Sequence, residues 1–188
     1  MALIGSNIID LVASCTPDQV AAYFQDTANL TAHGELVLQL ASGYGRPEIV
    51  RLLLTLGVPK NPALQGHPAI VSAAYSGHTE VIRVLGEFGT DVEQTDVRGF
   101  TALAAAARKG RKEVVYALLQ LGANVDSAEL TGLTPLMLAA KYGHSDIIEI
   151  LLQAGADKSR TERHGWTARE FAEYRKDTTA LRLLCGNT

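Results

Sequence analysis

The chain has 188 residues, of which 47% are hydrophobic and 20% are charged, and its net charge is −3. This composition is typical of a folded chain with a sizeable core, and the charge argues against a surface built mainly for nucleic acid or anionic lipid. Cys15 and Cys185 lie near opposite ends, which argues against a disulfide scaffold or a cysteine zinc site. We expect Cys15 to lie where the first helix pair turns and Cys185 to lie in the terminal helix, both as packing residues. No apolar run approaches the roughly 20 residues that span a bilayer, so we expect no membrane insertion.

The segment 1–33 predicts a pair of short helices. Thr16 and Gln19 have the spacing of a capping box, and Pro17 between them suits a first helical turn. The apolar start, MALIGSNIIDLVAS, contains Asp10 and no basic residue. We therefore expect a helix rather than a secretion signal, and a cytoplasmic chain with the nucleus as the alternative.

Glycines recur at fixed intervals along the rest of the chain. Four of them are 33 positions apart, namely Gly66, Gly99, Gly132 and Gly165. Two further series follow after steps of 11 and then 12 positions, namely Gly77, Gly110 and Gly143, then Gly89, Gly122 and Gly155. The same two steps join Gly34, Gly45 and Gly57, but the step from Gly34 to Gly66 is one position shorter than the steps between the later glycines. A period of this length indicates stacked structural repeats with a shortened first junction.

The unit at 132–164 indicates what each interval encodes. Thr134 fits the N-cap of a helix. Pro135 suits the first turn, because the N–H groups of that turn form no intrahelical hydrogen bond and proline therefore loses none. Gly143 ends that helix, and a second helix with one apolar face runs on to Gly155. Helices this short cannot bury their apolar faces alone, so we expect the units to stack into one core.

The segment TGLTPLMLAAKYGHSDIIEILLQAGAD at 131–157 closely resembles an ankyrin repeat, with Met137 where that family usually has histidine. The other units match less closely, since Ala102 stands in the place of the proline, Arg111 in that of the turn histidine, and Pro68 in that of the threonine. The resemblance covers about residues 5–188. It implies an all-α solenoid of stacked helix–turn–helix units with projecting loops.

This resemblance also suggests a division of the chain into units. We expect an N-terminal capping helix pair at 1–33, ankyrin repeats at 34–65, 66–98, 99–131 and 132–164, and a C-terminal capping repeat at 165–188.

Two features predict weak points in this array. The short first junction contains several prolines, which donate no backbone hydrogen bond, so we expect the loop at 57–68 to differ from the later loops and to couple its repeats less tightly. Gly86 stands in an outer helix where other units have Leu54, Leu119 and Leu152. Glycine destabilises a helix interior, so Gly86→Ala should raise the melting temperature unless a neighbouring side chain fills the site.

The histidines suggest structure rather than catalysis. His78 and His144 follow turn glycines, where the resemblance implies that the imidazole bonds the backbone between repeats. His33, His67 and His164 lie beside loop glycines, where we expect contacts with solvent or a partner. The chain lacks the zinc-ligand spacings and the strand-to-helix context of a phosphate loop. We therefore expect no enzymatic activity, no cofactor and no metal site.

The resemblance implies partner binding on the concave face. There, the end of the first helix of each repeat and the loop tips do not pack in the core. The candidates at helix ends are Tyr44, Tyr75, Arg108, Lys109, Lys141, Tyr142, Tyr174 and Arg175, and those at loop tips are Arg98, Phe100, Leu133, Arg163 and Trp166. Tyrosine, tryptophan and arginine are enriched at interface hot spots. Phe100, Leu133 and Trp166 follow successive glycines in register, which favours exposure for binding. The alternative is that the cations form a solvated face and the aromatic rings pack on neighbouring loops.

These observations predict a non-catalytic protein–protein interaction module, an adaptor, scaffold or regulatory subunit that is monomeric alone. Its partner would present acidic and apolar surface. One alternative is nucleic-acid binding through a basic stripe, against which the acidic residues Asp96, Glu129 and Glu162 at the loop bases argue. The other is an enzyme or small-ligand site, for which a thin two-layer array rarely provides a deep cavity.

Overall fold

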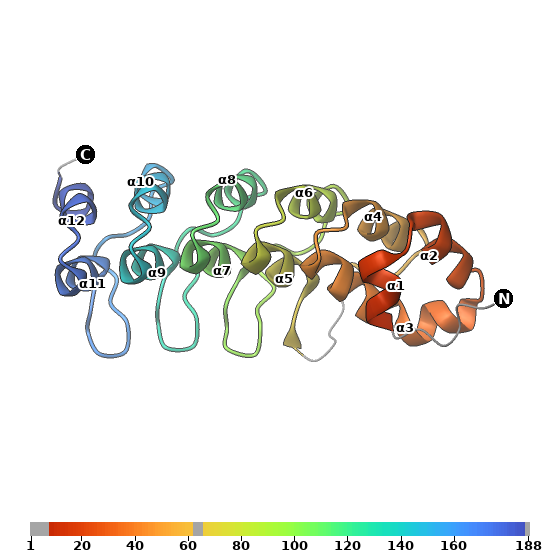
Figure 1. Cartoon of the computed structure of the whole chain (residues 1–188). Helices are drawn as coiled ribbons and strands as arrows, with labels where there is room; N and C mark the ends of the chain where they lie inside the picture. Colours follow the sequence, from red (N-terminus) through yellow and green to blue (C-terminus); the bar gives the residue numbers. More distant parts are fainter. Residues whose placement is uncertain (1–7, 62–65, 187–188) are drawn as a thin grey trace.

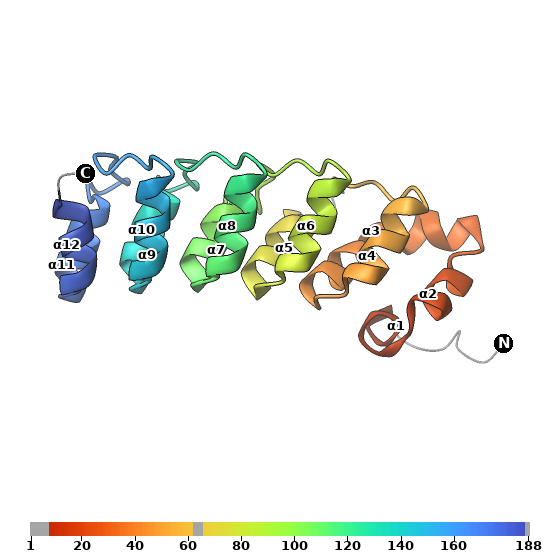
Figure 2. The same ribbon diagram turned by 90° about the horizontal axis from the view of Figure 1, so that it is seen from above.

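The computed structural model describes residues 8–61 and 66–186, and within these ranges it contains helices and no β-strand. The helices form two layers that run the length of an elongated molecule (Figures 1 and 2). The inner layer contains α1 (Ile8–Ser14), α3 (Thr27–Gly43), α5 (Ala69–Ser76), α7 (Ala102–Lys109), α9 (Pro135–Tyr142) and α11 (Ala168–Arg175). The outer layer contains α2 (Pro17–Tyr23), α4 (Pro47–Thr55), α6 (Thr79–Glu87), α8 (Lys112–Gln120), α10 (Ser145–Gln153) and α12 (Thr178–Cys185). Each helix packs on the next helix of its own layer, which confirms the all-α solenoid.

The expected helix boundaries are confirmed in the later repeats. Thr101, Thr134 and Thr167 are N-caps whose hydroxyl groups accept hydrogen bonds from main-chain N–H groups of the first helical turn. The inner helices α7 and α9 end at Gly110 and Gly143, both in the left-handed conformation that glycine adopts without steric cost. The capping box predicted at the start of α2 is also present.

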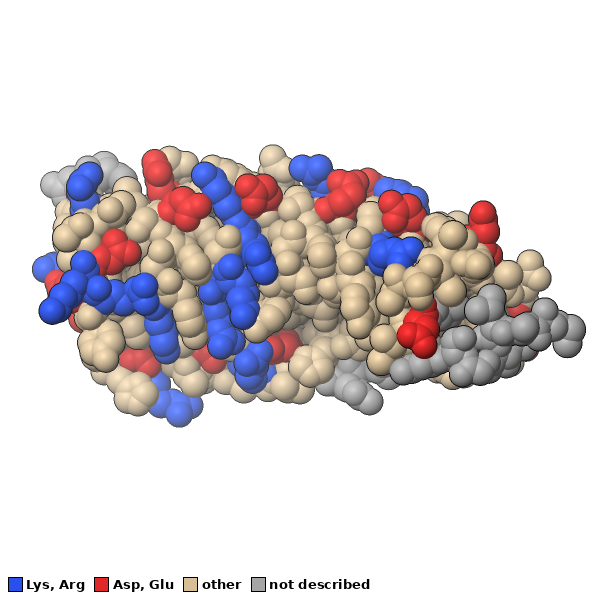
Figure 3. Space-filling model, in the orientation of Figure 1, with Lys and Arg blue, Asp and Glu red and all other residues tan. Residues whose placement is uncertain are grey.

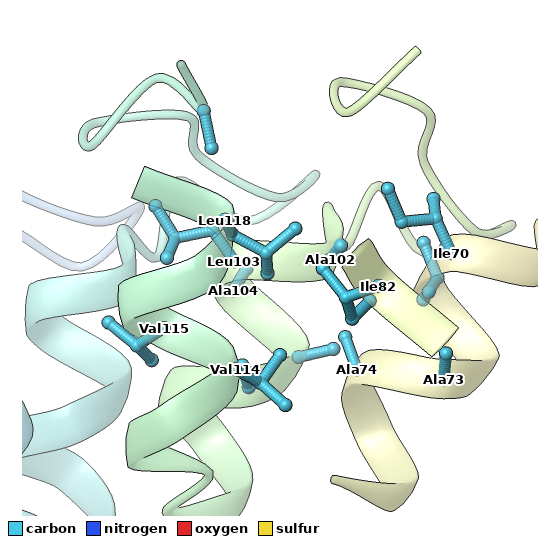
Figure 4. Packing of buried hydrophobic residues seen from close by; sticks show 14 of the residues in the cluster. Ile70, Ala73, Ala74, Ile82, Ala102, Leu103, Ala104, Val114, Val115 and Leu118 are labelled. Atoms are coloured by element: carbon cyan, nitrogen blue, oxygen red, sulfur yellow. The ribbon is translucent and has the colours of Figure 1, made fainter. Parts of the chain in front are cut away.

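The core is continuous from Val12 to Leu184. Inner helices contribute mainly small side chains, and the whole stretch from Ala102 to Ala107 in α7 is buried. Figure 4 shows how one helix pair meets the next, with Ile70, Ala73, Ala74 and Ile82 beside Ala102, Leu103, Val114 and Leu118. Because alanine lets helices approach closely, each repeat buries its apolar faces only against its neighbours.

The first repeat departs from the expected pattern. Helix α3 is 17 residues long and runs through Gly34, so the expected boundary between residues 33 and 34 falls inside a helix and not in a loop. A Cβ on Gly34 would lie 2.9 Å from Cγ2 of Val58, so this glycine allows a close approach. His33 consequently lies in α3, where its Nδ1 is 3.0 Å from the hydroxyl of Tyr23. Residues 62–65, and with them the centre of the predicted irregular loop, lie outside the described residues.

The two cysteines differ. Cys15 is half-buried against the core as expected, whereas Cys185 is exposed at the end of α12, so the expectation that it packs is wrong. The face of α12 that contains Leu184 is turned to the core, and Cys185 points elsewhere because consecutive helical positions lie about 100° apart.

Candidate protein-binding surface

The loops after α6, α8 and α10 are narrow hairpins that project from the inner layer in a row (Figure 1). A main-chain hydrogen bond connects each loop to the one before it. These hydrogen bonds run from the N–H of Val97 to the carbonyl of Gly66 (3.1 Å), from Leu130 to Arg98 (3.2 Å) and from Arg163 to Thr131 (2.9 Å). At Gly99, with φ of 79°, a Cβ would lie 2.9 Å from the nitrogen of Leu130, so only glycine allows the next loop to come this close. The loops therefore form one continuous surface.

A buried carboxylate holds the base of each hairpin. Asp96 Oδ1 accepts hydrogen bonds from the N–H groups of Arg98 and Phe100, both at 2.9 Å, and Glu129 and Glu162 form the equivalent bonds in the next two loops. Burial opposes the ionisation of Asp96, but the hydrogen bonds from Phe100 and Arg98 outweigh it and lower the pKa of its carboxyl group. The pKa of Glu162 is lowered by the same balance, with His164 as the side-chain donor. These acids are therefore engaged inside the loops.

Two residues that were expected to be exposed at the loop tips are buried, so the expectation of exposure is wrong for them. Phe100 and Leu133 are each only 8% exposed and belong to the core, because the chain turns back toward the inner helices after the loop glycine. The ring of Phe100 is covered by the guanidinium groups of Arg98 and Arg108, whose Cζ atoms lie 5.0 and 5.4 Å from its centroid. For these two residues the packing alternative holds.

The loops expose two apolar side chains that were not among the predicted residues. Val97 is 63% exposed and Leu130 is 72% exposed, and Arg163 occupies the same place in the last loop. These residues are also 33 positions apart, so the repeat period itself could have indicated them. They precede the loop glycine and are exposed, whereas Phe100 and Leu133, which follow it, are buried.

Trp166 is the residue of this register that remains accessible, with 36% of its surface exposed. Its ring lies 5.2 Å from that of Phe171 and 5.8 Å from that of Tyr174. Two adjoining hollows of about 460 and 290 Å³ flank the indole, and Lys141, Trp166 and Phe171 line both of them. We call this region the aromatic hollow, and its lining also includes Leu133, Tyr142 and Tyr174.

At the ends of the inner helices, cations lie over aromatic rings of neighbouring repeats. Lys109 Nζ is 4.2 Å from the ring centroid of Tyr75, and the guanidinium of Arg108 is 5.4 Å from that of Tyr142. The Arg108 Nε donates to the Tyr142 hydroxyl at 3.3 Å. As a hydrogen-bonding partner and a nearby positive charge, Lys109 lowers the pKa of the Tyr75 phenol. Such contacts combine cation–π attraction with charge that remains accessible.

The same arrangement continues into the last repeat, where Lys141 Nζ is 5.4 Å from the ring centroid of Phe171. We call these residues together the cation–aromatic row, which consists of Tyr75, Arg108, Lys109, Lys141, Tyr142 and Phe171. Arg175 donates to the main-chain oxygen of Lys141 at 3.4 Å and so lies at one end of this row.

Positive charge is concentrated in the C-terminal half of the molecule. Residues 1–97 contain 4 Lys and Arg against 10 Asp and Glu, whereas residues 98–188 contain 13 against 10. Figure 3 shows lysine and arginine gathered over the α7–α11 part of the face, while the part over α5 is mostly uncharged. Within the described ranges, none of Arg108, Lys109, Lys141 and Arg175 forms an ion pair, whereas Arg98 is held by Asp96 at 3.0 Å.

The remaining predicted residues are exposed but differ in position. Tyr174 is the most exposed of the candidate aromatic residues, and Arg163 is exposed at the last loop tip. Tyr44 is exposed at the end of α3, apart from the cation–aromatic row. The structure thus brings together candidates from the four units between residues 66 and 188.

The turn histidines have the predicted structural role. His78 Nε2 lies 2.9 Å from the main-chain oxygen of Gly43, and His144 Nε2 lies 3.2 Å from that of Arg108, so each imidazole joins its repeat to the previous one. Arg111, in the equivalent place, reaches the oxygen of Tyr75 from its Nε at 3.4 Å. Over residues 8–61 and 66–186, no cluster of three or more His, Cys, Asp or Glu could hold a metal ion.

Comparisons with known proteins agree with this architecture. The family model described as "Ankyrin repeats (3 copies)" matches residues 5–96, 38–129, 88–162 and 122–188, which overlap to cover almost all of the chain. A search of curated proteins found no match. None of the helices in the described part of the chain has the length and apolar character needed to cross a membrane. With two layers of stacked helix pairs, threonine-capped inner helices and these matches, the chain belongs to the ankyrin-repeat family.

Proposed function

We propose that this protein is an adaptor, scaffold or regulatory subunit that binds a partner protein through the cation–aromatic row and the adjoining loop tips. Ankyrin repeats are in general protein–protein interaction modules and are typically non-catalytic. The observation that carries the proposal is a set of four cations, Arg108, Lys109, Lys141 and Arg175, that come from neighbouring repeats and have no acidic partner among the described residues. Aromatic rings beside them offer apolar contact, so the surface suits a partner with acidic and apolar groups. A monomeric chain in the cytoplasm is part of the same proposal.

The test is affinity capture from a cell lysate followed by mass spectrometry, with the parent chain compared with Lys109→Glu, Tyr142→Ala and Trp166→Ala. Each substitution should weaken binding of a genuine partner by more than about 1 kcal/mol, because the three residues belong to one surface. Tyr116→Ala is the matched control, since Tyr116 is exposed on the outer helix α8. A partner that binds all three variants as tightly as the parent would contradict the proposal.

Folding must be checked alongside binding. The substituted side chains are exposed, so melting temperature and helix content should hardly change. Equal loss of folding in all three variants would instead assign these residues a packing role.

A further inference from the structure

The aromatic hollow combines apolar walls with unpaired positive charge at its edge. Leu133 and the rings of Trp166 and Phe171 supply apolar surface, and Lys141 lies between the two parts of the hollow. Among the described residues, the only carboxylate that lines it is that of Glu162, which is already bonded to main-chain N–H groups and to His164 Nδ1 at 2.9 Å. The hollow is therefore positive as well as apolar.

The cations continue from the hollow across the neighbouring repeat. Lys141 lines the hollow, and Arg108 and Lys109 lie one repeat further along the inner layer. Packed helices are about 8–10 Å apart, and an extended chain advances about 3.3 Å per residue. An extended segment that crosses the inner helices therefore passes one repeat in about three residues.

Resting on the proposed function, we infer that the protein recognises an extended acidic peptide with one apolar anchor. The anchor, a leucine or a similar aliphatic side chain, enters the aromatic hollow against Trp166 and Phe171. A carboxylate beside it pairs with Lys141, and further carboxylates about three residues away reach Arg108 and Lys109. The order of apolar and acidic groups in the partner is thus set by the order of the hollow and the cations.

The position of Trp166 makes this inference directly measurable. It is the chain's single tryptophan, and it lies in the hollow, so its fluorescence reports on this site alone. The probe is a synthetic peptide without aromatic residues, in a glycine–serine background, with one leucine, one adjacent glutamate and two more glutamates three and four places from that one. Both sequence orders are used, because they correspond to the two directions in which an extended chain can cross the helices, and binding of either suffices.

We expect saturable binding with a blue shift of the emission as the indole loses contact with water. Replacing the leucine by serine, or the glutamates by lysine, should weaken binding at least about tenfold, and so should Lys141→Glu in the protein. Arg83→Glu is the matched control, since it makes the same charge change on the outer helix α6 and should bind as the parent does. Raising the salt concentration should weaken binding of the acidic peptide, because the Debye length falls to about 10 Å at 0.1 M.

Three results would overturn the inference: no saturable change with either peptide, equal binding by Lys141→Glu, or tighter binding of a twelve-nucleotide oligothymidine than of the peptide. The last result would show that the rings and cations serve single-stranded nucleic acid. If the peptides fail while a captured protein still depends on Lys109 and Tyr142, only the peptide inference is lost. If captured proteins ignore all the concave-face variants, the proposed function itself is lost.

Discussion

Among single residues, the buried acids at the loop bases show most clearly how charge is used in this fold. Asp96 is nearly inaccessible, yet it is stable as a carboxylate because two main-chain N–H groups and the Arg98 side chain donate hydrogen bonds to it. One of these donors, the N–H of Phe100, is buried as well. Removing the carboxylate would leave that donor without a partner.

Asp96→Ala should therefore lower the free energy of unfolding by about 1–3 kcal/mol, and Asp96→Asn, which keeps an acceptor oxygen, by less. The pKa of Asp96 is lower in the folded than in the unfolded state, so its contribution is fully present above the unfolded pKa of about 3.9 and is lost as the pH falls through the folded pKa. Urea denaturation of the parent and Asp96→Asn between pH 2 and pH 7 measures this. A difference in stability between the two that does not shrink in acid would contradict the assignment.

Gly86 shows how a neighbour changes the meaning of a glycine. It lies inside α6, as expected, but a Cβ there would lie 2.6 Å from Cδ2 of Leu121, a half-exposed side chain at the end of α8. A neighbouring side chain thus fills the site, which is the condition under which we expect no rise in melting temperature from Gly86→Ala. The space is filled, and Leu121 must rotate away before an alanine gains its helix propensity.

We expect Gly86→Ala alone to change the melting temperature little. In a Leu121→Ala background the same substitution should stabilise the fold by about 1 kcal/mol, because the obstacle is gone and only the helix propensity remains. A double-mutant cycle by thermal denaturation measures this coupling. Strict additivity of the two substitutions would show that Leu121 does not occupy the site.

Among the helices of the inner layer, three consecutive ones end at a glycine and the last one does not. Gly77, Gly110 and Gly143 end α5, α7 and α9 in the left-handed conformation, whereas α11 ends at Lys176 with φ of 58°. A side chain in that conformation costs about 1–2 kcal/mol, because its Cβ crowds the following carbonyl oxygen. The last inner helix therefore ends under strain that its predecessors avoid.

Lys176→Gly should relieve this strain and raise the free energy of unfolding by about 1 kcal/mol. Lys176→Ala is the control, because it removes the charge and the long side chain but keeps the Cβ, and it should not stabilise the protein. Chemical denaturation of the three proteins separates these effects. Equal stabilisation by alanine and glycine would show that charge rather than backbone conformation matters here.

At the scale of the whole molecule, stability is distributed unevenly along the array. Helices α5, α7 and α9 all have packed neighbours on both sides, but α7 and α9 have threonine N-caps, whereas the N-cap of α5 is Pro68, whose side chain forms no capping hydrogen bond. The first repeats also meet at the short junction. In a linear array each repeat depends on its neighbours, so a weak junction limits how far stability spreads.

Hydrogen exchange should therefore be fastest for the amides of α1 and α2, intermediate in α3–α6 and slowest in α7 and α9. Mass spectrometry of peptides from partly exchanged protein measures these differences. Exchange of all helices at one common rate would mean that the array unfolds as a single unit, and the predicted weakness of the first junction would then be wrong.

Along the whole chain, the repeat period indicated the helix pairs and the later loops, because capping threonines, turn glycines and apolar faces act within one repeat. It did not predict the course of α3, since Gly34 resembles the loop glycines in spacing but lies in a helix against Val58. Local signals and spacing are the same there, and packing alone makes the difference.

For the surface, the residue types that recur at the helix ends and loops could be identified without a structure, and they indicated Lys109, Lys141, Tyr142 and Trp166 as candidates. The stacking of the repeats was needed to show that Phe100 faces the core while Val97 faces solvent, and that no acidic side chain pairs with Lys141 in the described ranges. The difference lies in how far apart in the sequence the interacting groups are. Caps, turns and the Arg98–Asp96 pair depend on atoms close together in the sequence, whereas the exposure of a side chain depends on neighbouring repeats that stacking brings into contact with it.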